Sequence, residues 1–153
     1  YKKGKLYGFS QGWYENGRLE FQWKNKSDGS HKGWYKNGQL EYEYYTKSDK
    51  IDGLLKRWYE NGQLKFKQNH KNGTYNGLLQ RWYKNGQLSL EKNYINGKSS
   101  GLHNSWYENG QKHYEYKFKG GMRHGIQKTW NENGTLYGMW LYKDGDLISE
   151  DYF

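Results

Sequence analysis

The chain has 153 residues, the usual length of one domain, and 20% of them are aromatic. It contains no cysteine, which excludes disulfide bonds and thiolate metal sites, and its formal charge of +9 comes mostly from lysine. No stretch approaches the run of about 18 apolar residues that a membrane helix needs, and the first residues lack the apolar region of a signal peptide. The composition therefore predicts a core built mainly from tryptophan, tyrosine and phenylalanine.

A seven-residue motif, Trp-Tyr-x-Asn-Gly-x-Leu, returns along the whole chain in six near copies. Successive copies are 21 residues apart once and then 24 residues apart four times, with the motif tryptophans at Trp13, Trp34, Trp58, Trp82, Trp106 and Trp130. Self-similarity at such a period indicates a repeat array in which each unit packs on its neighbours. We therefore interpret residues 1–153 as a single repeat domain, with units at 8–28, 29–52, 53–76, 77–100, 101–124 and 125–146 and a closing strand at 147–153.

The first half of each unit predicts a strand followed by a tight turn. This strand starts at a glycine five residues before the motif tryptophan and ends with Trp-Tyr. The Asn-Gly dipeptide follows, and it predicts an antiparallel turn because both residues tolerate positive φ. The glycines of these turns are Gly17, Gly38, Gly62, Gly86, Gly110 and Gly134.

The second half of each unit predicts another strand and another turn. In the first copy Leu19, Phe21 and Trp23 alternate with polar residues, which is the period of a strand with one apolar face. The second turn carries Gly4, Gly73, Gly97, Gly121 and Gly145, with Asp49 in the equivalent place. The first connection, Lys24 to His31, is three residues shorter, which predicts a trimmed turn.

Glycine recurs too often for stable helices, so the predicted fold class is all-β. The expected architecture is an elongated repeat array of antiparallel β-hairpins forming one long twisted sheet, with about two strands per 24-residue repeat. The last strand is the more acidic one and could serve as a capping edge.

The pattern Gly-apolar-x-x-x-Trp-Tyr-x-Asn-Gly-x-Leu resembles the variant MORN repeat of bacterial proteins, a group that includes the YwqK-type antitoxins. The resemblance covers the whole chain. It implies a run of β-hairpins in a long antiparallel sheet that binds other molecules, with neutralisation of a partner toxin as the best-known case. Three departures, Asn131 for Tyr, Lys112 for Leu and Ser30 in the apolar place, each fall in a single copy and affect local packing.

A second resemblance keeps an alternative open. Gly12-Trp13-Tyr14 and Gly33-Trp34-Tyr35 are similar to the aromatic-rich repeats with which some surface proteins bind choline or cell-wall polymers. Those repeats carry a Gly-Trp and a separate Trp-Tyr-Tyr, whereas each unit here has one motif tryptophan. A cell-wall polysaccharide or surface-attachment module is therefore the alternative function.

The residues that could support catalysis or metal binding form no known motif. Serine, histidine and aspartate are present without a nucleophile motif, and no glycine-rich loop is followed by the lysine and helix of a phosphate site. The histidines are scattered through different repeat positions: His31, His70, His103, His113 and His124. We therefore expect no enzyme activity, no catalytic residue, no metal and no cofactor.

Two stripes of side chains remain as candidates. The six motif tryptophans share a strand position, and we interpret them as a structural aromatic ladder in the core. The tyrosine after each tryptophan points to the opposite face, where an arginine and an exposed leucine precede it at Leu55-Arg57 and Leu79-Arg81. Aromatic and arginine side chains are enriched at interface hot spots. The predicted partner-binding residues are Tyr35, Arg57, Tyr59, Arg81, Tyr83 and Tyr107, with cross-strand packing as the alternative role.

The sequence therefore predicts a non-enzymatic repeat scaffold that binds a protein partner, with the antitoxin or immunity component of a bacterial toxin pair as the specific role. A basic chain suits a partner with an acidic surface. Lipid and nucleic-acid binding are less favoured, because lysine does not form bidentate phosphate clamps. Because no apolar run is long enough for a membrane helix, we expect a soluble protein. The chain starts partway through a repeat and without methionine, so it is expected to be either cytoplasmic or exported after loss of a leader.

Overall fold

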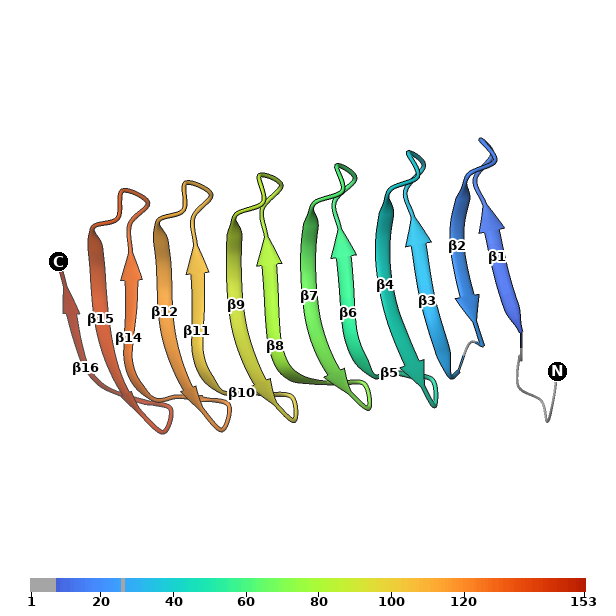
Figure 1. The fold of residues 1–153 in the computed structure, drawn as a ribbon. Coiled ribbons are helices and arrows are strands. Elements are labelled where there is room, and N and C mark those ends of the chain that lie inside the picture. Colours follow the sequence, from blue (N-terminus) through green and yellow to red (C-terminus); the bar gives the residue numbers. More distant parts are fainter. Residues whose placement is uncertain (1–7, 26) are drawn as a thin grey trace. The chain divides into compact units, whose positions relative to one another are not determined.

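The computed structural model describes residues 8–25 and 27–153, and all regular structure in these residues is β-strand (Figure 1). The predicted turn glycine Gly4 lies outside them. The described residues contain no helix long and apolar enough to cross a membrane. They divide into two units between Thr74 and Tyr75, and each unit is described by itself.

The first unit contains seven strands: β1 (Phe9–Trp13), β2 (Leu19–Lys24), β3 (Gly29–Trp34), β4 (Leu40–Lys47), β5 (Lys50–Ile51), β6 (Gly53–Trp58) and β7 (Leu64–Lys71). The antiparallel order is β1-β2-β3-β4-β6-β7, and the short β5 pairs with the end of β4. Each Trp-Tyr-x-Asn-Gly segment joins two neighbouring strands of a hairpin, as the repeat pattern predicts.

The second unit contains nine strands: β8 (Thr74–Trp82), β9 (Leu88–Ile95), β10 (Lys98–Ser99), β11 (Gly101–Trp106), β12 (Lys112–Lys119), β13 (Met122–Arg123), β14 (Gly125–Trp130), β15 (Leu136–Lys143) and β16 (Asp146–Tyr152). Its order is β8-β9-β11-β12-β14-β15-β16, with β10 on β9 and β13 on β12. The predicted all-β array of antiparallel hairpins is confirmed in both units.

The Asn-Gly turns form as predicted, but not for the predicted reason. At Gly86 the amide donates to the Tyr83 carbonyl at 3.0 Å, and φ is +88°. Asn85 does not have positive φ; its Oδ1 accepts a hydrogen bond from the amide of Gln87 at 2.9 Å. The motif asparagine therefore shapes the turn through its side chain, and the glycine alone supplies the left-handed residue.

Positive φ at two consecutive residues occurs in the second turn instead. Asn72 and Gly73 have φ of 52° and 81°, the backbone of a tight two-residue hairpin turn. The same geometry recurs at Ser48-Asp49, Asn96-Gly97, Gly120-Gly121 and Asp144-Gly145. The predicted trimmed turn contains Lys26, which lies outside the described residues; β2 ends at Lys24 and β3 begins at Gly29.

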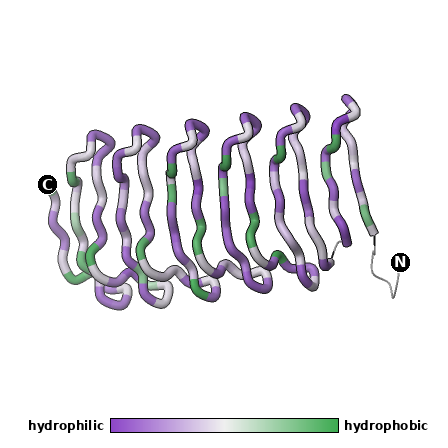
Figure 2. Tube along the Cα trace, viewed as in Figure 1, coloured by the Kyte–Doolittle hydropathy of each residue, from purple (hydrophilic) through white to green (hydrophobic). Residues whose placement is uncertain are grey.

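The two faces of each sheet differ in burial. We call the face with Arg57 in the first unit, and with Arg81 in the second, the arginine face; the opposite, tryptophan face carries the motif tryptophans. Most of the buried side chains lie on the arginine face, among them Leu55, Leu79, Gln68, His103 and Gln127, at 8%, 4%, 0%, 2% and 1% exposure. Figure 2 shows that hydrophobic residues occupy only short segments of each hairpin.

This burial corrects one expectation. Leu55 and Leu79 were expected to be exposed, but they are only 8% and 4% exposed. Trp13 is 57% exposed and the other five motif tryptophans are half-buried. The best-packed layer is therefore on the arginine face, opposite the tryptophan ladder.

Two glycines explain the Gly-Trp pairs of the first two hairpins. A Cβ atom at Gly33 would lie 2.2 Å from the ring of Tyr42, and a Cβ at Gly12 would lie 2.2 Å from the ring of Phe21. Each glycine pairs across the hairpin with the aromatic residue that covers it. The glycine before the tryptophan thus lets an aromatic ring lie flat on the sheet.

Candidate partner-binding face

The tyrosines that follow the motif tryptophans connect neighbouring hairpins. Their hydroxyl groups donate to the backbone carbonyl of the next motif tryptophan: Tyr14 to Trp34 at 2.7 Å, Tyr35 to Trp58 at 2.8 Å, Tyr83 to Trp106 at 2.8 Å and Tyr107 to Trp130 at 2.9 Å. All four rings are half-buried. Tyr59 is also half-buried, with the Lys65 amine 5.3 Å from its ring centroid. These residues therefore hold the array together, whatever else they contact.

The motif asparagines form a second set of links, which sequence reasoning missed. Their Nδ2 atoms donate to a backbone carbonyl in the next Asn-Gly turn: Asn16 to Lys36, Asn37 to Glu60, Asn85 to Glu108 and Asn109 to Glu132, at 2.7 to 3.3 Å. The recurrence of asparagine at this place in the motif was the signal. Its side chain has both an acceptor, which shapes its own turn, and a donor, which binds the next turn.

Arg57 lies at the centre of the aromatic cluster of the first unit. Its side chain is exposed, and it pairs across strands with Tyr42 and Phe66. Burial raises the pKa of Tyr42, Tyr44 and Tyr35, and the nearby Arg57 charge opposes that rise in each case. The structure thus brings two predicted residues, Tyr35 and Arg57, within electrostatic reach of each other.

The rings around Arg57 form an ordered platform. Tyr44 stacks on His31 with ring centroids 4.7 Å apart and an interplanar angle of 4°, and it also stacks on Tyr42 at 5.8 Å. His31 is fixed by a 2.9 Å hydrogen bond to Thr46. An exposed cation beside stacked rings gives a surface of the composition found at protein interfaces.

Arg81 has a similar place in the second unit, together with a cation that sequence reasoning missed. Burial lowers the pKa of the Lys92 ammonium, and the Arg81 charge lowers it further. Lys92 occupies a position of β9 that points to the aromatic side of the strand, between Leu90 and Tyr94. The signal that could have identified Lys92 was a lysine at a strand position where the alternation predicts an apolar residue.

The predicted partner-binding residues do not all belong to one unit. Tyr35, Arg57 and Tyr59 are in the first unit, whereas Arg81, Tyr83 and Tyr107 are in the second. Aromatic side chains on the arginine face accompany each group. They are Phe21, Trp23, Tyr42, Tyr44 and Phe66 in the first unit, and Tyr94, Tyr114, Tyr116, Phe118 and Trp140 in the second unit.

Strand carboxylates lie beside lysines on the tryptophan face. Glu43 lies 2.9 Å from the Lys56 amine and 3.8 Å from that of Lys32. In the second unit Glu115 binds Lys112 at 2.5 Å. The amine of Lys112 also lies 5.7 Å from the ring centroid of Trp130. Lys112, which stands where the motif has leucine, therefore contacts both Glu115 and Trp130 on the tryptophan face. The faces therefore differ in charge as well as in burial.

Metal ligands do not cluster in the part of the chain that the structure describes. Across residues 8–25 and 27–153 no three histidine, aspartate or glutamate side chains lie close enough together to hold an ion.

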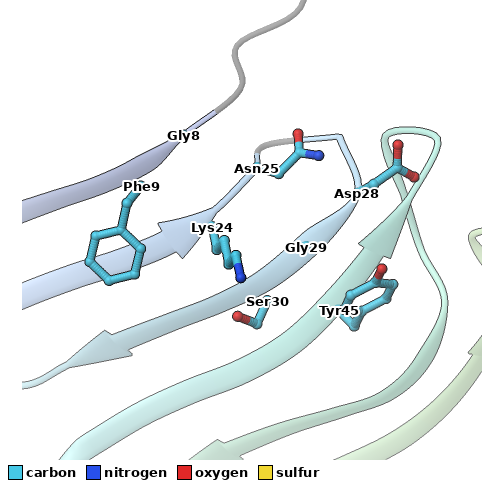
Figure 3. Close-up of a pocket in the computed structure, with 8 residues that line it drawn as sticks. All are labelled: Gly8, Phe9, Lys24, Asn25, Asp28, Gly29, Ser30 and Tyr45. Atoms are coloured by element: carbon cyan, nitrogen blue, oxygen red, sulfur yellow. The ribbon is translucent and has the colours of Figure 1, made fainter.

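A hollow of about 470 Å³ opens beside the trimmed first connection (Figure 3). One residue from each of four adjacent strands lines its floor, namely Phe9, Lys24, Ser30 and Tyr45. Phe9 and Tyr45 stand on either side and are 57% and 47% exposed. The serine that departs from the apolar pattern leaves space between the two rings.

The repeat geometry agrees with the comparison to known families. The family model described as MORN repeat variant matches residues 27–48, 51–72, 75–96 and 123–153, each of which contains at least part of a hairpin described above. No curated protein matches the chain. The matched segments cover more than half of the sequence, and the chain belongs to the MORN repeat variant family.

Proposed function

We propose that the chain is a non-enzymatic repeat scaffold whose arginine face binds an acidic protein. Its specific role would be that of an antitoxin or immunity protein, which covers the active surface of a partner toxin. The formal charge of +9 favours an acidic partner and fast association at low salt.

The observation that carries the proposal is the placement of Arg57 and Arg81. Both side chains are exposed, and each stands among tyrosine or phenylalanine rings on the face from which the strand glutamates Glu43, Glu91 and Glu115 are turned away. Arginine and tyrosine are over-represented among the few residues that dominate binding energy. A rigid surface of this composition supports binding with little loss of side-chain entropy.

The links between hairpins support the same proposal. Within each unit, the tyrosine and asparagine hydrogen bonds fix neighbouring hairpins against each other, so the arginine face of that unit is formed before a partner arrives. A pre-formed surface lowers the free energy that binding must supply for ordering.

The test is co-expression with the protein encoded by the neighbouring gene. The wild-type chain should copurify with that protein and restore growth if the protein is toxic. The double variant Arg57→Glu/Arg81→Glu should do neither while keeping its melting temperature. Lys98→Glu/Lys119→Glu changes the charge equally at exposed positions of the second turns and should retain both activities. Equal behaviour of the two double variants would refute the proposal.

Carbohydrate binding is the second candidate, and the exposed rings on the tryptophan face of β1 favour it. Trp13 and Phe9 are each 57% exposed, and Phe9 borders the hollow beside Lys24 and Tyr45. Flat exposed rings suit stacking on sugars. Sedimentation with purified cell-wall polysaccharide should then be lost in Trp13→Ala and Phe9→Ala, whereas the arginine-face variants should still sediment.

A further inference from the structure

Two cations lie near each other on the arginine face of the second unit. Arg81 pairs with Leu90 and Leu79 pairs with Lys92, so Arg81 and Lys92 are diagonal neighbours on β8 and β9. Diagonal neighbours across antiparallel strands are about 7 to 8 Å apart, within reach of long side chains. The charge of Arg81 disfavours the charged form of Lys92, which burial already disfavours.

Two tyrosines of the same face lie within electrostatic reach of Arg81. Burial raises the pKa of Tyr94 and of Tyr114, and the Arg81 charge opposes the rise at both. Each phenol is therefore a neutral hydrogen-bond donor close to the arginine. Tyr94 pairs with Gly77 and Tyr114 with Ser105, so the two tyrosines come from β9 and β12.

Three other residues on this face are closed to water. Leu79, His103 and Ser105 are 4%, 2% and 5% exposed. His103 donates from Nε2 to the Asn93 carbonyl at 3.0 Å, and burial lowers its pKa, so the ring is uncharged near neutral pH. Charges beside buried, uncharged side chains are screened less than charges in open solvent.

Negative side chains are missing from this face of the described strands β8 to β15. Glu91 accepts a 2.9 Å hydrogen bond from Gln80 and Glu115 binds Lys112, and both glutamates are on the tryptophan face. In the first unit, by contrast, the charges of Glu41 and Glu20 reach Tyr42 and raise its pKa further. Two neighbouring cations disfavour each other's charge, and an anionic ligand beside them would offset that repulsion.

We propose that Arg81, Lys92, Tyr94 and Tyr114 bind a carboxylate side chain, from aspartate or glutamate, that the protein partner presents. This proposal rests on the proposed function. The arginine supplies a two-pronged donor that matches a carboxylate, the lysine supplies a compact charge, and the two phenols donate hydrogen bonds. The position equivalent to Lys92 in the preceding hairpin is Gln68, so the second cation belongs to the second unit alone.

The experiment uses the full chain with its lysines reductively methylated with ¹³C-formaldehyde, which gives each lysine its own NMR signal. Lys92→Arg identifies the Lys92 signal by its loss. The probe is a synthetic ten-residue glutamate peptide at low salt. The Lys92 signal should shift on addition of the peptide, and its titration should move to higher pH because a bound carboxylate favours the ammonium.

Arg81→Gln should weaken the response by about tenfold or more, as truncation of one partner of a close charge pair usually does. Lys98→Gln removes the same charge in an exposed second turn and should leave the response unchanged. A Lys92 signal that ignores the peptide, or responds equally in Arg81→Gln, would overturn the site. A response to inorganic phosphate at lower concentration than to the peptide would overturn the choice of a carboxylate.

A further variant separates this site from the proposed function. Lys92→Gln copies the Gln68 of the preceding hairpin and should therefore fold. Reduced partner binding by Lys92→Gln supports the carboxylate site. If Lys92→Gln binds the partner as wild type does while Arg57→Glu/Arg81→Glu does not, the carboxylate site is wrong and the protein-binding face stands. A chain that binds the peptide at Lys92 but no partner would instead retain the site and refute the proposed function.

Discussion

The hydroxyl group of Tyr107 donates a hydrogen bond to the backbone carbonyl of Trp130, 2.9 Å away and one repeat further along the chain. The bond links the turn after β11 to the end of β14. The same bond joins Tyr35 to Trp58 and Tyr83 to Trp106. Within each unit, a tyrosine at this place in the motif therefore attaches one hairpin to the next, in addition to the strand pairing.

Tyr107→Phe removes this hydrogen bond and keeps the ring. We expect a loss of about 0.5 to 1.5 kcal/mol in the free energy of unfolding, the usual net value of one hydrogen bond. Urea denaturation measures it. Tyr137→Phe is the matched control, because Tyr137 is 47% exposed and its hydroxyl has no hydrogen-bond partner among the described residues. Equal midpoints for the two variants would mean that the Tyr107 bond does not stabilise the array.

Asn109→Asp tests the asparagine links. Aspartate keeps the oxygen that accepts from the Gln111 amide but loses the Nδ2 that donates to the Glu132 carbonyl at 2.8 Å. Asn133→Asp makes the same change in the last Asn-Gly turn, where the Thr135 amide binds Oδ1 and no following Asn-Gly turn exists within the described residues. We expect Asn109→Asp to lower the free energy of unfolding by about 1 kcal/mol more than Asn133→Asp.

The repeat pattern was sufficient to predict the strands and turns of this fold. Glycine and asparagine at fixed places determine where strands end, and alternation determines which residues share a face. The reason for the Asn-Gly turn was wrong, because the sequence does not reveal whether asparagine acts through its backbone or its side chain. Asn85 shapes its turn through a side-chain hydrogen bond, whereas Asn72 shapes a second turn through positive φ of its backbone.

Burial was harder to predict than strand position. Tryptophan is the largest apolar residue in the motif, so the tryptophan face was expected to be the core. The structure instead buries Leu55 and Leu79, which lie on the arginine face. Which face of a single sheet is better packed depends on the side chains of neighbouring strands, and Lys92 could be placed among them only once the strand register was known.

Leu79→Ala tests this distribution of burial. The side chain is 4% exposed, so its truncation leaves a cavity and should cost about 2 to 5 kcal/mol. Leu102→Ala makes the same change on the tryptophan face, where Leu102 is 50% exposed, and should cost about 1 kcal/mol or less. Urea denaturation midpoints at constant slope compare the two variants. Similar losses would show that the arginine face is not the better-packed layer.

Stability should fall as the pH decreases from about 6.5. Burial lowers the folded-state pKa of His103 and of His70, so the unfolded chain binds protons in a range where the folded chain does not. The stabilisation from each neutral ring is present above the unfolded pKa and is lost as the pH falls toward the folded pKa. His103→Gln copies Gln127 in the next hairpin and should show a smaller loss of melting temperature between pH 7 and pH 5 than the wild type. An equal loss of melting temperature in His103→Gln and in the wild type would contradict a contribution of His103 to the pH dependence.

Hydroxyl-radical footprinting of the complex with the copurified partner tests most directly whether the arginine face binds. Oxidation of side chains is read by mass spectrometry, and it distinguishes the two faces of one strand, which backbone measurements do not. We expect Tyr42, Tyr114 and Tyr116 on the arginine face to be protected in the complex, while Trp34, Trp58 and Trp106 on the tryptophan face keep the oxidation rates of the free chain. Protection of the tryptophans, with unchanged oxidation of the tyrosines, would contradict the account.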